Sequence, residues 1–192
     1  MKREQIIGIL EPISRLQAWN HQQREDGLRD AAVLIPLVER EQWHVLLTKR
    51  TDHLHHHPGQ VSFPGGRADK IDHSPLHTAL RETEEEVGIS ADLIDIAGII
   101  EPYLTVEFNV IPIVGFVRPT FSLNIDEFEV AEVFEVPLSV LAEPSNYQQK
   151  EIFWEGKNRQ FWELMYNDYQ IWGATASMLY AFASRLNDEK QP

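Results

Sequence analysis

Apolar residues recur with helical spacing near the start of the chain. Between residues 3 and 19 they stand mostly three or four positions apart, which predicts a leading amphipathic helix that Pro12 could kink. The polar run that follows predicts a connecting loop before the first strand. At the other end, residues 171–186 predict a closing helix.

Short apolar blocks between these two ends predict strands. Residues 31–38 and 43–48 are separated by a short polar run, which predicts a hairpin. Further strands are predicted at residues 96–100, 110–117, 129–136, 151–154 and 160–166. The chain therefore contains more predicted strands than helices.

A central helix is predicted at residues 75–87. Ser74 can cap its first turn, Pro75 suits the first helical position, and Gly88 can end it. Strands on both sides of this helix, with helices at both ends of the chain, predict an α/β fold arranged as a sandwich around a mixed sheet. The sequence shows no internal repeat and no linker, so residues 1–192 are expected to form a single domain.

Charge and composition narrow the function. The chain has 17 Lys and Arg against 30 Asp and Glu, a net charge of −13, which disfavours nucleic acid as a partner. There is no cysteine, so disulfides, thiolate metal sites and cysteine nucleophiles are excluded. No signal peptide and no long apolar run is evident, so we expect a cytoplasmic protein without a membrane partner.

Three carboxylates share one face of the predicted central helix. Glu82, Glu85 and Glu86 fall within roughly 100° on a helical wheel. Like charges at this spacing repel, but carboxylate oxygens are preferred ligands of Mg²⁺ and Mn²⁺. A solvated acidic face would have the same pattern, so the helix alone leaves both interpretations open.

The residues around this helix resemble a known motif. The stretch GGRADKIDHSPLHTALRETEEEVGI resembles the Nudix box, in which a glycine and an acidic residue precede the pattern Arg-Glu-x-x-Glu-Glu-x-Gly. The matching residues are Gly66, Asp72, Arg81, Glu82, Glu85, Glu86, Gly88 and Ile89. The chain departs from the commonest pattern by having Asp72 where glutamate is usual and one extra residue between Gly66 and Arg81, which leaves the role of Asp72 open.

This resemblance implies a Nudix-type α/β/α sandwich with a catalytic loop-helix-loop at about residues 66–89, and metal-dependent hydrolysis of a diphosphate bond. Mg²⁺ or Mn²⁺ is the expected cofactor, held by Glu82, Glu85, Glu86 and the Gly66 carbonyl. Arg81 and Glu85 are the expected catalytic residues, with Glu85 the favoured general base. Candidates for the base outside the box are Glu101, Glu107, Glu127 and Glu129.

The segment upstream of the box, LLTKRTDHLHHHPGQVSFPGG, resembles the motif of coenzyme A pyrophosphatases. The match covers Leu46, Leu47, Thr48, Arg50, Gly59, Phe63, Pro64, Gly65 and Gly66, whereas His55 replaces the arginine of that motif. It implies a small-molecule diphosphate substrate related to coenzyme A. The substrate-binding residues it implies are Arg50, His55, Gly59, Phe63 and Gly65.

Other functions remain to be weighed against this one. A hydrolase of NADH, ADP-ribose or dinucleoside polyphosphates would carry the same box glutamates, whereas a binding protein without catalysis would be expected to lack them. The histidines at positions 53 and 55–57 could bind a transition metal, but a polar turn is the favoured explanation. Likewise, Trp154, Trp162 and Trp172 are expected to be core aromatics rather than an adenine-stacking surface.

Overall fold

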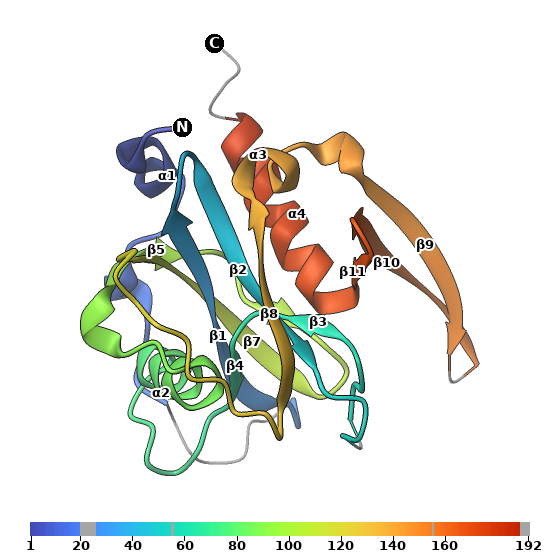
Figure 1. Cartoon of the computed structure of the whole chain (residues 1–192). Helices are drawn as coiled ribbons and strands as arrows, with labels where there is room; N and C mark the ends of the chain where they lie inside the picture. Colours follow the sequence, from blue (N-terminus) through green and yellow to red (C-terminus); the bar gives the residue numbers. More distant parts are fainter. Residues whose placement is uncertain (20–25, 55, 155, 189–192) are drawn as a thin grey trace.

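The structure, a computed structural model, describes residues 1–19, 26–54, 56–154 and 156–188 (Figure 1). Its helices are α1 Arg3–Gly8, α2 Pro75–Val87, α3 Leu138–Leu141 and α4 Gly173–Asp188, with short 3-10 helices at Ile13–Arg15, Ala91–Leu93 and Pro144–Asn146. The strands of the large sheet are β1 Arg29–Glu39, β2 Trp43–Arg50, β3 Val61–Ser62, β4 Gly65–Arg67, β5 Ile94–Ile99, β6 Tyr103–Leu104, β7 Phe108–Val117 and β8 Val130–Pro137. A smaller sheet contains β9 Tyr147–Trp154, β10 Lys157–Tyr166 and β11 Tyr169–Trp172.

The large sheet is mixed. Its strand order is β3-β2-β1-β7-β5, with β4 paired to β1, β6 to β7 and β8 to β2. Strands β1 and β7 run parallel in a register that pairs Arg29 with Phe108, and the other pairings are antiparallel. Because β1 and β7 start at the same end of the sheet, the residues around Gly65 and Gly66, which pair with the start of β1, lie at that end too.

Alternation along β1 divides the core into two clusters. Ile35 and Leu37 face one side, with α4 and the smaller sheet, whereas Leu34 and Val38 face the other side, with α2. Figure 1 shows α2 and α4 on opposite sides of the central strands. The predicted α/β fold with a mixed sheet between helices is therefore confirmed.

The predicted helices at both ends need correction. The leading helix ends at Gly8 instead of continuing to residue 19, because Pro12 has no N–H to donate and Glu11 instead forms a β-bridge with Ile99. The closing helix begins at Gly173, because residues 169–172 pair with β10 as β11. No helix within the described ranges is long and apolar enough to cross a bilayer.

Candidate active site

Helix α2 begins and ends as its sequence predicts. The Ser74 side chain caps it by accepting a hydrogen bond from the N–H of His77 at 3.2 Å, and Pro75 occupies the first turn. Gly88 ends it in the left-handed conformation, where any larger residue would also meet Asn124. The helix packs its apolar stripe, including Ala79 and Val87, against the sheet. The register of its glutamates is fixed by this packing.

The three glutamates of the predicted cluster sit in different environments. Glu86 is only 5% exposed and accepts a hydrogen bond from the N–H of Gly65 at 3.2 Å. The Glu82 side chain is 19% exposed, whereas that of Glu85 is 59% exposed. Glu84 points to solvent, as the helical wheel predicts. The structure therefore brings Glu82 and Glu86 into the interior and leaves Glu85 at the rim.

Burial changes the acidity of the two inner glutamates. Burial raises the pKa of Glu86 to about 8: the N–H of Gly65 and the charge of Arg50 oppose the rise, and the charges of Glu82 and Glu129 add to it. Burial also raises the pKa of Glu82, against the effect of a hydrogen bond from Arg81. Glu82 and Glu86 thus repel each other, and Arg81 and Arg50 offset only part of the effect of burial on their pKa values.

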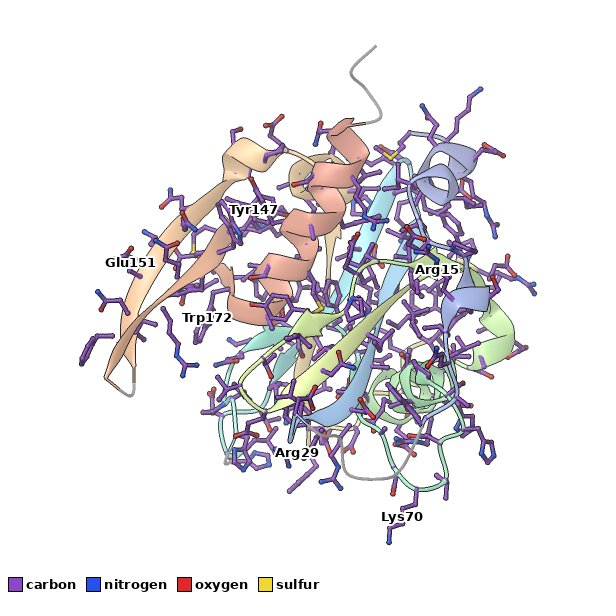
Figure 2. All side chains as sticks on the ribbon, turned by 180° about the vertical axis from the view of Figure 1, so that it is seen from behind. Arg15, Arg29, Lys70, Tyr147, Glu151 and Trp172 are labelled. Atoms are coloured by element: carbon purple, nitrogen blue, oxygen red, sulfur yellow. The ribbon has the colours of Figure 1, made fainter. Side chains whose placement is uncertain are left out.

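Strand β4 places its backbone directly against the glutamates. Gly65 has a φ of +147°, and a Cβ there would lie 2.5 Å from the Ala32 carbonyl oxygen. A Cβ on Gly66 would lie 2.5 Å from the Glu82 carboxylate. Only glycine at these two positions therefore lets β4 lie against both β1 and α2. Figure 2 shows that Arg29, at the start of β1, and Lys70, on the loop leading to α2, lie at the same end of the molecule.

Asp72, whose role the sequence left open, is the partner of Arg81. The Asp72 carboxylate is fully buried and accepts hydrogen bonds from Arg81 Nε at 3.0 Å and Arg81 Nη2 at 2.9 Å. Burial favours a higher pKa for Asp72, but hydrogen bonds from Arg81, the N–H of Asp69 and Thr78 outweigh it and hold the pKa well below its usual range. Asp72 is thus an ionised anchor within the fold.

Arg81 connects this anchor to the glutamate face. It donates to Glu82 Oε1 at 2.8 Å and to Glu85 Oε2 at 2.7 Å, in addition to its two bonds to Asp72. Its guanidinium is therefore fully engaged with carboxylates of the chain. This arrangement favours a positioning role for Arg81 over the direct catalytic role predicted from the sequence.

Two charged residues from outside the box, Arg50 and Glu129, act through their charges on Glu86. The Nε atom of Arg50 is buried and has no hydrogen-bond partner within the part of the chain that the structure describes. Glu129 is held beside β2 by its carbonyl, which accepts from the N–H of Thr51 at 3.0 Å, and its charge acts on both Glu82 and Glu86. Of the other candidates outside the box, Glu101 and Glu107 form ion pairs with Arg185 and Arg29, and Glu127 is exposed. Glu129 is thus the candidate from outside the box whose charge acts on Glu82 and Glu86.

The remaining predicted substrate residues are scattered. Gly59 lines a cavity of about 270 Å³ together with Lys49, Asp168, Tyr169, Trp172 and neighbouring residues. The Phe63 side chain is 2% exposed and packs in the core, so it supports the loop and offers no surface to a ligand. His55 lies outside the described residues. Of the remaining histidines in its loop, His53 makes an edge contact with the Phe128 ring at 4.8 Å.

The tryptophans that the sequence placed in the core differ in their surroundings. Trp162 packs against the larger core cluster and stacks on Tyr180, with ring centroids 3.9 Å apart. Trp172 is half-buried, contacts Phe161 and lines the cavity described above. The side chain of Trp154 lies outside the described residues.

Comparisons with known proteins agree with these features. The NUDIX domain model matches residues 28–155. The chain is 42% identical over 177 residues to Nudix hydrolase NudL of Enterobacter sp. (strain 638), covering 91% of this chain and 92% of that protein. It is 38% identical over 177 residues to NudL of Salmonella typhimurium, with the same coverage of 91% and 92%.

Solved structures share the fold at low sequence identity. The MutT protein from Methanosarcina mazei Go1 superposes with a TM-score of 0.54 and 19% identity, covering 86% of this chain and 96% of that one. The C. elegans Ap4A hydrolase binary complex superposes with a TM-score of 0.50 and 18% sequence identity, covering 58% of this chain and 82% of that one. With a domain match over more than half of its length and relatives similar along nearly all of it, the chain belongs to the Nudix hydrolase family.

Proposed function

We propose that this chain hydrolyses the diphosphate bond of coenzyme A or one of its derivatives, giving phosphopantetheine and adenosine 3′,5′-bisphosphate in a metal-dependent reaction. The observation that carries the reaction type is the buried Glu86 carboxylate, which binds the N–H of Gly65 in β4 and on which Glu82 and Glu129 act as further negative charges. Carboxylates gathered in this way favour a divalent cation, and a loaded cation attracts phosphate.

The donor set fits Mg²⁺ or Mn²⁺, because carboxylate and carbonyl oxygens are the hard ligands these ions prefer. Glu82 and Glu86 would hold the ion, with Glu85 and the Gly66 carbonyl oxygen as further ligands. In residues 1–19, 26–54, 56–154 and 156–188, no three acidic or histidine side chains form a finished metal site. Arg81 binds Glu82 Oε1 and Glu85 Oε2, and the N–H of Gly65 binds Glu86 Oε2, so each bond uses one oxygen of its carboxylate and the other oxygen can turn to a metal ion. A bound ion would polarise the phosphoryl group and lower the pKa of an attacking water.

The chain's own residues supply the other functions. The buried Nε of Arg50, which has no partner among the described residues, is available to donate to a phosphate oxygen next to Glu86. Glu129 is a better candidate for the general base than Glu85, because Arg81 already binds the Glu85 carboxylate. Arg81 itself orients Glu82 and Glu85.

The coenzyme A assignment is supported by the segment upstream of the box, because Lys49 and Gly59 of this segment line the cavity of about 270 Å³. The neighbouring Arg50, which follows an irregularity in the pairing of β2 with β8, acts through its charge on Glu86. The volume of the cavity is close to the lower end of small-molecule sites, at roughly 300 Å³. At this cavity Lys49 is available to the 3′-phosphate of coenzyme A.

The test is product analysis by mass spectrometry. The purified chain would be incubated with Mg²⁺ or Mn²⁺ and, separately, coenzyme A, NADH, ADP-ribose and diadenosine polyphosphates. We expect preferential conversion of coenzyme A to phosphopantetheine and adenosine 3′,5′-bisphosphate. Preferential conversion of another compound would overturn the substrate, and no conversion of any compound would overturn catalysis.

A further inference from the structure

A chain of hydrogen bonds connects the N-terminal segment to the glutamate face of α2. The indole Nε1–H of Trp19 donates to Thr78 Oγ1 at 2.8 Å, and the Thr78 hydroxyl donates to Asp72 Oδ2 at 3.0 Å. Asp72 accepts two bonds from Arg81, which donates in turn to Glu82 and Glu85. Trp19 is therefore linked by consecutive hydrogen bonds to the carboxylates proposed to bind the metal.

The segment that carries Trp19 is anchored on the same region. The backbone N–H of Trp19 donates to the carbonyl oxygen of His73 at 3.1 Å, in the loop that leads into α2. Leu16 and Trp19 pack against the core cluster that contains α2. This segment precedes residue 28, where the NUDIX domain match begins. Trp19 therefore contacts the domain from a segment that precedes the matched residues.

The geometry around Thr78 gives Trp19 a specific effect. The Thr78 hydroxyl has one hydrogen and two acceptors within reach, the Asp72 carboxylate at 3.0 Å and the Ser74 carbonyl oxygen at 3.4 Å. The Trp19 indole N–H binds the hydroxyl oxygen and favours the orientation in which the hydrogen points to Asp72. Because Asp72 is fully buried, water cannot replace a donor that turns away.

We propose that Trp19 and Thr78 are positioning residues for the diphosphate hydrolysis proposed above, on which this inference rests. They fix the Asp72 carboxylate, which holds the Arg81 guanidinium in the orientation that aligns Glu82 and Glu85. The N-terminal segment then contributes to the rate of the reaction as well as to the packing of α2.

The test separates the hydrogen bond from the packing of the ring. Trp19→Phe retains an aromatic ring and removes the indole N–H, Thr78→Val removes the hydroxyl at nearly constant shape, and Thr78→Ser retains the hydroxyl. Trp43→Phe is the matched control, because the half-buried Trp43 donates to the Met1 carbonyl oxygen and packs against the core cluster on the other side of the sheet from α2. For each variant, kcat and KM for coenzyme A would be measured with saturating Mn²⁺.

We expect Trp19→Phe and Thr78→Val each to lower kcat about three- to tenfold, the loss typical of one hydrogen bond, with KM changed less than about twofold. The double variant should be no slower than Thr78→Val, because Trp19 acts through Thr78. Thr78→Ser should restore most of the rate, and Trp43→Phe should leave it unchanged. Unchanged kcat in both Trp19→Phe and Thr78→Val, or additive losses in the double variant, would overturn the proposal.

A second measurement is independent of activity. In metal-free protein labelled with ¹⁵N, the Arg81 Nε–H resonance should shift and exchange faster with solvent in Trp19→Phe and Thr78→Val, but not in Trp43→Phe. If the wild type hydrolyses none of the compounds, the proposed function fails, but the Arg81 resonance still tests whether Trp19 and Thr78 hold Arg81 in place through Asp72. An Arg81 resonance that is the same in all variants would overturn it.

Discussion

Two groups of charged side chains meet at helix α2, one around Asp72 and one around Glu86, and they differ in how their charges are balanced. Around Asp72 the charges are matched, because Arg81 binds the buried carboxylate through two hydrogen bonds and Thr78 and Asp69 add further donors. Around Glu86 they are not matched, because Glu82 and Glu129 add like charge and the Nε of Arg50 has no partner within the described ranges. A matched cluster holds a fold together by itself, whereas an unmatched one favours a ligand.

The largest expected effect on the reaction rate comes from removing the charge of Glu86. Glu86→Gln keeps the shape and the acceptor for the N–H of Gly65 but loses the negative charge. We expect kcat to fall by about 10³-fold, because a metal ligand is lost. Steady-state kinetics against coenzyme A would check this, with Glu84→Gln on the exposed face of the same helix as the control that retains activity. Near-wild-type rates for Glu86→Gln would show that Glu86 is not a ligand.

The next effect comes from breaking the matched cluster. Asp72→Asn leaves Arg81 without its buried counter-ion, and we expect a loss of about 3 kcal/mol in the free energy of unfolding. Urea denaturation would measure it. Asp95→Asn, which breaks exposed ion pairs with Arg3 and Arg118, is the control and should change stability little. Equal stability of the two variants would mean that Asp72 is not a structural anchor.

The two clusters should also respond to pH in opposite directions. The pKa of Glu86, which faces Glu82, Glu129 and Arg50, is raised to about 8 in the fold, so the folded state binds more protons than the unfolded state. Stability of the metal-free protein should therefore fall as pH rises from about 5 to about 8. The pKa of Asp72 is lowered, so its contribution is present above about pH 4 and is lost as pH falls below that value. Denaturation of the wild type and of Glu86→Gln across this range would test the assignment: the fall above pH 5 should be smaller in Glu86→Gln, and an identical slope would contradict it.

The smallest expected effect lies at the cavity that Lys49 lines. Lys49→Ala should raise KM for coenzyme A about three- to fivefold with little change in kcat, because a partly exposed charge contributes modestly to binding. Dephospho-coenzyme A, which lacks the 3′-phosphate, is the matched substrate and should show no such change. An equal rise in KM for both substrates would show that Lys49 does not bind the 3′-phosphate.

Local signals in the sequence determined much of α2 and its surroundings. Ser74, Pro75 and Gly88 define where the helix starts and stops, and the helical period puts Glu82, Glu85 and Glu86 on one face. The box motif was sufficient to predict the family and the mixed α/β fold. These features depend on neighbours a few residues apart, which a single chain reveals without its tertiary contacts.

Tertiary structure decided what depends on residues far apart in the chain. It ended the leading helix at Gly8 by pairing Glu11 with Ile99, and it converted residues 169–172 from helix to strand by offering β10 as a partner. It also paired Asp72 with Arg81 and linked both to Trp19 by hydrogen bonds through Thr78. Burial and long-range hydrogen bonds set these outcomes, and no local pattern encodes either of them. Helical periodicity thus placed Glu82, Glu85 and Glu86 on one face of α2, whereas packing buried Glu86 and brought Arg81 against the other two.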